Sequence, residues 1–150
     1  MRLIHKTALA AMAMLISGLL SGTATAHPQP TDASIQSAWT AQYTRGDVGG
    51  AHASGHIYKR GDGRVQLTGT LWDTKKSDHK LAILQTWATY ADGGHRYERD
   101  VTGSSKALGS DGYNFASSVR DIQVQECLGH KTASGRLVFD KCAPGWATIW

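Results

Sequence analysis

The clearest pattern of hydrophobic and polar positions in the chain runs from residue 64 to residue 90. Apolar or small residues at 65, 67, 69 and 71 alternate with larger or polar ones at 66, 68, 70 and 72, the period of a half-buried strand. A second apolar run, residues 81–90, follows the polar segment 73–80. The pattern predicts two long antiparallel strands joined by an exposed loop.

Glycine-containing turns divide the rest of the chain into short strand-like segments. Gly61-Asp62-Gly63, Asp92-Gly93-Gly94 and Asp111-Gly112 offer the positive φ that tight hairpin turns need. The other segments expected to be extended are residues 35–43, 55–60, 95–101, 113–117, 119–128, 137–142 and 146–150. No segment shows a helical stripe, so we expect an all-β, single-domain antiparallel β-sandwich of about eight strands.

The first 26 residues have the composition of an export signal. Arg2 and Lys6 give a basic start, residues 8–20 are apolar, and Ala24-Thr25-Ala26 offers the small residues that signal peptidase reads. The apolar run is too short for a membrane anchor, and no later segment approaches 18 apolar residues. We expect cleavage after Ala26, an extended leader at 27–34, a domain at 35–150, and a secreted protein without a membrane span.

Removal of the signal leaves a chain with little net charge. Fourteen of the 16 basic residues remain against all 12 acidic ones, a net charge of +2 with histidine neutral. No cluster of Lys and Arg interleaved with aromatic residues is present to follow a phosphate backbone. Nucleic acid is therefore not an expected partner.

Cys127 and Cys142 are the only cysteines. An even cysteine count in an exported chain indicates a disulfide. The alternative is a redox-active or metal-binding pair, but the chain has no Cys-x-x-Cys motif and no histidine at zinc-ligand spacing after either cysteine. We predict a Cys127–Cys142 disulfide.

Three aromatic residues form the predicted ligand-binding site. Trp72 is out of phase with the apolar residues of its strand, so its side chain should face away from the core. Tyr90 and Tyr97 lie on neighbouring predicted strands. Aromatic side chains on an open sheet face give large contact area at low entropy cost and can stack on sugar rings. The alternative is that Trp72 closes an edge of the sandwich.

Catalytic patterns are missing from the sequence. There is no G-x-S-x-G, H-E-x-x-H, P-loop or G-x-G-x-x-G. Glu98 and Glu126 are the only glutamates, and a glycosidase would need two carboxyl groups across one cleft. We expect no catalytic residue, no resident metal and no cofactor.

His27 offers one alternative function, because it becomes the first residue after cleavage. An N-terminal histidine presents both its α-amino group and its imidazole to a metal, and this resembles the copper brace of lytic polysaccharide monooxygenases and of periplasmic copper-resistance proteins. His52 and His56 could supply a further ligand but are expected in a glycine-rich loop. The prolines at 28 and 30 indicate an extended leader that would make a copper site weak.

The polar segment 73–80 offers a second alternative, a secreted inhibitor or antibacterial effector that presents this loop. Asp73 and Asp78 could bind Ca²⁺, but Lys75 and Lys76 oppose a cation there and EF-hand spacing is absent. We interpret the segment as a solvated loop.

The segment LTGTLWDTKKSDHKLAILQTWATYADGG, followed by VRDIQVQECL and a later DKC near a Trp, resembles small exported actinobacterial proteins of unknown function. The resemblance spans most of residues 69–146 and implies a β-sandwich with a disulfide, with Ser77-Asp78-His79 standing where the family has Asp-Gly. The sequence as a whole predicts a non-catalytic extracellular binding module whose partner is a glycan or a protein surface.

Overall fold

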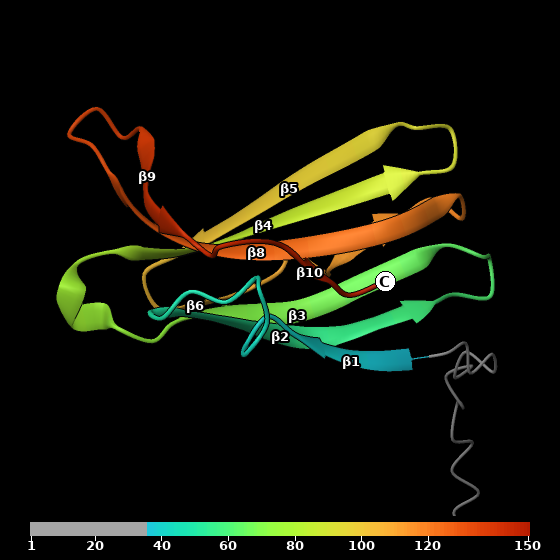
Figure 1. Ribbon diagram of the computed structural model, residues 1–150, viewed down its shortest axis with the longest axis horizontal. Helices are drawn as coiled ribbons and strands as arrows, with labels where there is room; N and C mark the ends of the chain where they lie inside the picture. The colour runs from blue at the N-terminus through green and yellow to red at the C-terminus, as the bar shows by residue number, and fades with distance from the viewer. Residues whose placement is uncertain (1–35) are drawn as a thin grey trace, which may run out of the picture.

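Two antiparallel β-sheets packed face to face form the computed structural model, which describes residues 36–150 (Figure 1). Its elements are β1 (Gln36–Thr40), β2 (Ala51–Lys59), β3 (Val65–Asp73), the 3₁₀ turn η1 (Lys76–Asp78), β4 (Leu81–Tyr90), β5 (His95–Thr102), β6 (Ser105–Ala107), β7 (Tyr113–Phe115), β8 (Val119–Lys131), β9 (Leu137–Cys142) and β10 (Ala147–Thr148). Sheet A has the order β1-β2-β3-β6, with β7 also paired to β3. Sheet B has the order β10-β8-β4-β5, with β9 also paired to β8. The predicted antiparallel β-sandwich is confirmed, with ten strands in place of about eight.

The N-terminal predictions lie outside the described residues. These are the export signal at 1–26, the leader at 27–34 and the possible copper ligand His27. Within residues 36–150, no helix is both long and apolar enough to cross a membrane.

The prediction that β3 and β4 pair as a hairpin is wrong. β3 pairs with β2 on one edge and with β6 and β7 on the other, whereas β4 lies in sheet B between β5 and β8. Residues 74–80, which include η1, carry the chain from one sheet to the other, and most of their side chains are exposed. The apolar alternation therefore identified the buried face of each strand. β3 and β4 do not pair along their edges; their buried faces meet across the sandwich.

Two further strand boundaries differ from the sequence prediction. β2 begins at Ala51 and not at residue 55, so His52 lies on the same strand as His56 and not in a glycine-rich loop. Ala51 pairs with Asp73 at the far end of β3, and this long ladder extends the strand through Gly55. β6 was not predicted, because its three residues are all exposed and show no alternation.

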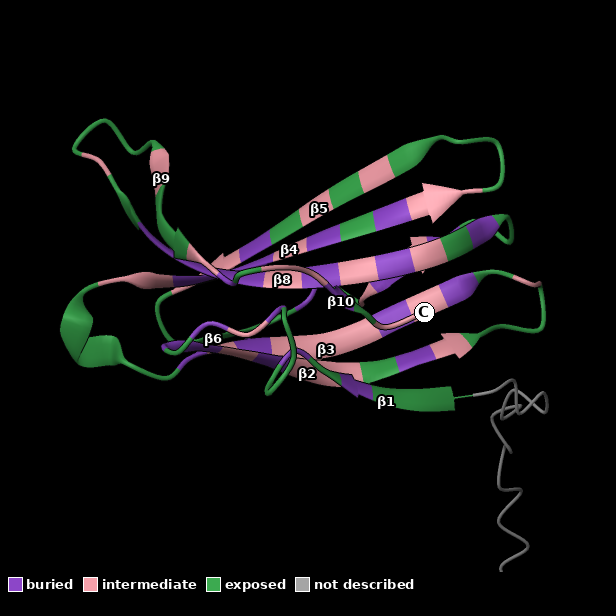
Figure 2. Ribbon diagram, viewed as in Figure 1, coloured by how far each residue is buried: buried purple, intermediate pink, exposed green. Residues whose placement is uncertain are grey.

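Side chains that alternate inward from both sheets fill the space between them. Figure 2 shows buried residues alternating with more exposed ones along β4 and β8. The largest fully buried apolar side chains of this core are Phe115, Ile57, Leu67, Leu71, Leu84, Leu108 and Ile122. Most of the remaining side chains of each strand face outward.

Trp39 packs over a pair of glycines on the inner face of sheet A. Trp39 of β1 is opposite Gly55 of β2, which is in turn opposite Gly69 of β3. The indole is 6% exposed, and its Nε1 donates to the backbone oxygen of Thr68 at 3.1 Å. The missing Cβ atom at Gly69 leaves room that this large side chain occupies.

We therefore expect Gly69→Ala to lower the free energy of unfolding by about 1–3 kcal/mol, the usual effect of overpacking a core. An added Cβ would lie 2.5 Å from the oxygen of Ser54 and 2.9 Å from Cζ2 of Trp39, so the strand pair must shift. Gly49→Ala is the matched control, because a Cβ there meets no atom within 4 Å. Urea unfolding of both variants measures the difference, and equal stability would contradict this account of Trp39.

Candidate functional site

An aromatic pair lies exposed on the outer face of sheet B. Trp87 of β4 is directly opposite Tyr97 of β5, and their ring centroids are 6.2 Å apart at an interplanar angle of 60°. The two residues are 36% and 37% exposed. His95 adds a third ring, 5.0 Å from Trp87. Together these rings form a surface with both tilted and edge-on aromatic contacts.

Arg99 continues this surface along β5. Its guanidinium carbon lies 5.2 Å from the ring centroid of Tyr97 and 4.9 Å from that of Phe139 on β9. Phe139 is itself 36% exposed. A guanidinium held between two rings gains cation–π attraction from each of them and loses little of its donor capacity. We call Trp87, Tyr97, Arg99 and Phe139 the sheet B platform.

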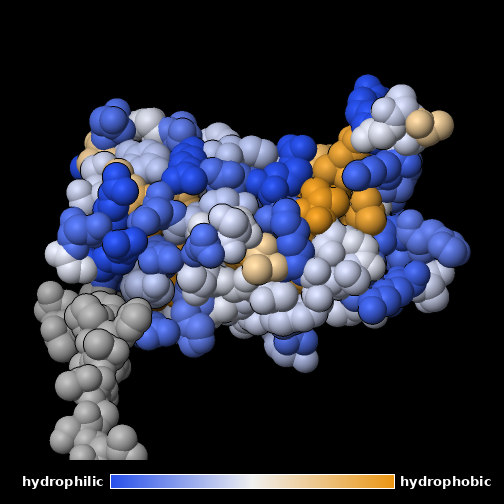
Figure 3. Space-filling view, turned by 180° about the vertical axis from the view of Figure 1, so that it is seen from behind, coloured by the Kyte–Doolittle hydropathy of each residue, from blue (hydrophilic) through white to orange (hydrophobic). Residues whose placement is uncertain are grey.

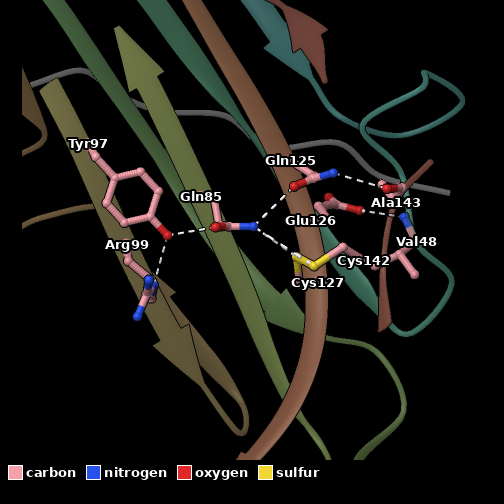
Figure 4. Close-up of a disulfide and its surroundings, with 9 residues drawn as sticks. All are labelled: Val48, Gln85, Tyr97, Arg99, Gln125, Glu126, Cys127, Cys142 and Ala143. Atoms are coloured by element: carbon pink, nitrogen blue, oxygen red, sulfur yellow. Dashed lines mark hydrogen bonds between the residues drawn. A yellow bond between two sulfur atoms is a disulfide. The ribbon is translucent and has the colours of Figure 1, made fainter. Parts of the chain in front are cut away.

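A chain of hydrogen bonds fixes the platform from the side of β8 (Figure 4). Nε of Arg99 donates to the Tyr97 hydroxyl at 2.9 Å, and this hydroxyl donates to Oε1 of Gln85 at 2.6 Å. Nε2 of Gln85 donates to Oε1 of Gln125 at 3.0 Å, and Nε2 of Gln125 donates to the backbone oxygen of Ala143 at 3.0 Å. Each group donates in the same direction, so neighbouring bonds reinforce each other and hold the phenol and the guanidinium in place.

The predicted disulfide is confirmed and lies beside this chain. Cys127 and Cys142 pair directly across β8 and β9, with their Cα atoms 4.0 Å apart. Nε2 of Gln85 also lies 3.1 Å from Sγ of Cys127. The disulfide thus ties β9, which carries Phe139, to the strand next to the platform.

The three aromatic residues of the predicted ligand-binding site, Trp72, Tyr90 and Tyr97, do not lie together. Trp72 faces outward as expected, but from sheet A, where it stacks on His52 of β2 with ring centroids 5.2 Å apart. Tyr90 packs against the core. Only Tyr97 belongs to the sheet B platform, because the sequence indicates the face of a strand but not the sheet to which that strand belongs.

Trp87, Arg99 and Phe139 were not identified from the sequence. A usable signal was present for Trp87, since it shares a phase with Gln85 and Thr89 and is out of phase with Ala82, Leu84 and Ala88. No comparable signal existed for Arg99 and Phe139, because their contact depends on how β9 approaches β5.

Glu126 is the most deeply buried carboxyl group in the sandwich. It is 0% exposed, and its two side-chain oxygens accept the backbone N–H groups of Ala53 at 2.6 Å and Val48 at 3.3 Å. Burial raises the pKa of this carboxyl from 4.5 to about 7; the two N–H donors oppose that rise, and the nearby Asp47 adds to it. Glu126 therefore connects β8 to β2 and to the segment before it.

The two glutamates do not form a glycosidase pair. Glu98 lies on β5, where Nε of Arg96 donates to it at 2.8 Å, and Glu126 lies on β8 beyond the intervening strand β4. Because Glu126 is enclosed by the core, it cannot act on a substrate held at the surface.

Two surface hollows lie away from the Trp87–Tyr97 pair. One of about 470 Å³ is lined by Gln42, Asp47, Gly49, Gly50, Ala51, His52 and Thr74. The other, of about 360 Å³, is lined by His79, Leu81, Val101, Thr102, Gly103, His130 and Lys131. In the described part of the chain, no three His, Cys, Asp or Glu side chains are placed to hold one metal ion.

The loop at residues 73–80, the alternative inhibitory element, is mostly exposed and is held by hydrogen bonds within its own turns. Oδ1 of Asp73 accepts the N–H of Lys75 at 2.9 Å, and Oδ1 of Asp78 accepts the N–H of Lys80 at 3.0 Å. Both carboxylates thus bond to nearby backbone, as aspartates in turns commonly do.

Comparisons of the chain with protein-family models, with curated proteins and with solved structures find no match. The resemblance to exported actinobacterial proteins stays a prediction, and the candidate function rests on the geometry of the platform.

Proposed function

We propose that this protein is a secreted, non-catalytic binding module that takes a carbohydrate on the outer face of sheet B. The observation that carries the proposal is the exposed Trp87–Tyr97 pair, in which hydrogen bonds hold the Tyr97 hydroxyl in place. Sugar rings have apolar faces that stack on aromatic rings, and a surface that is already ordered loses little entropy when it binds.

The surroundings of the pair support a polar ligand with many hydroxyl groups. Gln123 of β8 and Gln85 of β4 flank Trp87 on the same outward face, so amide donors and acceptors border the rings. Small-molecule sites combine aromatic contact with a few fixed polar groups in this way. The export signal expected at 1–26 and the disulfide support placement in an oxidising, extracellular environment.

Trp87→Ala is expected to lower the affinity for a bound glycan at least about tenfold, because aromatic residues at the centre of a contact carry a large share of binding energy. The half-exposed indole contributes less to folding, so the thermal midpoint should fall by only a few degrees. A glycan array with neutral and acidic glycans identifies a ligand, and calorimetry then compares the variants.

Trp72→Ala is the matched control for this experiment, since it removes an indole from the opposite outer face. It should leave glycan affinity unchanged. Loss of binding in Trp72→Ala but not in Trp87→Ala would place the site on sheet A, and failure of the intact protein to bind any glycan would overturn the proposed function.

A further inference from the structure

Arg99 has donor groups that none of the described residues 36–150 uses. Its Nε donates to Tyr97, while within residues 36–150 neither terminal nitrogen of the guanidinium donates a hydrogen bond to the protein, and no carboxylate forms an ion pair with Arg99. Arg96, three residues earlier on the inward face, differs in both respects. It is paired with Glu98, and its Nη1 donates to the backbone oxygen of Asn114.

The free edge of the guanidinium is also held in a defined orientation. The guanidinium lies over the Tyr97 and Phe139 rings, and the hydrogen bond from Nε to the Tyr97 hydroxyl fixes its rotation. The two terminal nitrogens of such a group match the spacing of two carboxylate oxygens. A carboxylate could therefore bind with two parallel hydrogen bonds and without reordering the side chain.

From these contacts we propose that the sheet B platform binds an acidic glycan, with an uronate carboxylate on Arg99 and the sugar ring on Trp87 and Tyr97. This inference rests on the proposed function and names its ligand class. The negative charge comes from the ligand because the described part of the chain supplies none to Arg99.

The same face continues into a hollow that contains Lys131. Tyr97, Arg99 and Val101 alternate outward along β5, and Val101 also lines the hollow of about 360 Å³ together with His130 and Lys131. From residue 97 to residue 101 a strand rises by about 13 Å, which gives room for more than one sugar unit. Figure 3 shows apolar surface gathered at the foot of the projecting β8–β9 hairpin, with hydrophilic residues around it.

An acidic side chain, Asp140, contacts His130 of this hollow and is already engaged. Asp140 of β9 lies 2.8 Å from Nδ1 of His130 and 3.9 Å from Nζ of Lys80. Lys131 has no such partner among the described residues. An acidic polymer that extends from Arg99 toward β9 would therefore meet a second positive charge.

The test compares three oligosaccharide probes of equal length on the purified, disulfide-bonded protein. These are a galacturonate oligomer, its methyl ester and sulfated dextran. The galacturonate oligomer should bind about tenfold or more tightly than the ester, because esterification removes the charge and one of the two acceptor positions. Arg99→Gln should abolish this preference, so that the acid and the ester bind with the same low affinity.

Two variants control for charge and for geometry. Arg136→Gln removes the same charge from an exposed position in the β8–β9 turn and should leave the preference intact. Arg99→Lys keeps the charge but lacks the planar pair of donors, so most of the preference should be lost. Thermal unfolding of each variant confirms that the platform is still folded.

Failure of the acidic ligand and failure of the proposed function give different results. Equal affinity for the acid and its ester, with both weakened by Trp87→Ala, would overturn the acidic ligand and leave carbohydrate binding in place. Tighter, Arg99-dependent binding of sulfated dextran would overturn the carboxylate in favour of a sulfate. Absence of binding to every glycan would overturn both proposals.

Discussion

Cys142→Ser is expected to lower the free energy of unfolding by about 3 kcal/mol under oxidising conditions. Cys127 and Cys142 are 15 residues apart, and a cross-link that closes a loop of about this length reduces the entropy of the unfolded chain by that amount. The variant also leaves the Cys127 thiol buried without its partner. Urea unfolding at one pH measures the difference.

Reduction of the wild-type protein provides the control, because its stability in excess dithiothreitol should approach that of the variant in the same buffer. The loss should also loosen β9 and thereby Phe139, which β9 brings to Arg99. Two reactive thiols in the native, unreduced protein, or a variant as stable as the wild type, would contradict the prediction.

The fold could be predicted from the sequence because each long strand has one buried face. In β3, Val65, Leu67 and Leu71 are buried while Trp72 is not, as the period of two requires. Turn chemistry was equally informative: Gly63 and Gly93 both adopt positive φ in the turns that join β2 to β3 and β4 to β5.

Strand pairing could not be predicted in the same way. The alternation in β3 and β4 fits a hairpin and a pair of facing strands equally well, since both arrangements bury one face of each strand. Which arrangement forms depends on the strands that pair with the two edges of β3 and β4. Two of these strands, β6 and β7, pair with one edge of β3 and are only three residues long.

The platform was only partly predictable for a related reason. Tyr97 could be identified as an aromatic residue on a strand, but its partners come from the β4–β5 register and from the approach of β9. The hydrogen bonds from Arg99 through Gln85 to Gln125 likewise require three strands in register. The local sequence pattern does not predict such cross-strand geometry.

Glu126 left a clearer signal that the sequence analysis did not use. It shares the phase of Ile122 and Val124, the apolar residues of β8, so the alternation alone predicts a buried carboxyl group. A charged residue at a core position needs hydrogen-bond partners, and here these are two backbone N–H groups from outside β8.

The contribution of Glu126 to the free energy of unfolding should therefore fall as the pH rises from about 4.5 to about 7. Burial raises the pKa of this carboxyl to about 7 in the folded state, above its value of 4.5 in the absence of the fold. Below both values the group is protonated in both states and contributes no pH dependence. Between them the unfolded chain releases the proton first, so ionisation favours unfolding, by about 3 kcal/mol in all.

Glu126→Gln isolates this effect from the other titrating groups. The amide does not ionise, and it offers one acceptor oxygen to two N–H donors, so the variant should be less stable than the wild type by about 1–3 kcal/mol at pH 4. This deficit should shrink, or reverse, between pH 4 and pH 8, because only the wild type loses stability there.

Asp47→Asn should move the midpoint of the change to lower pH, since it removes the charge that helps to raise the pKa of Glu126 while keeping an oxygen for the N–H of Tyr43. Urea unfolding of all three proteins across this range measures the difference, and a constant gap between the wild type and Glu126→Gln would contradict a buried, protonated Glu126.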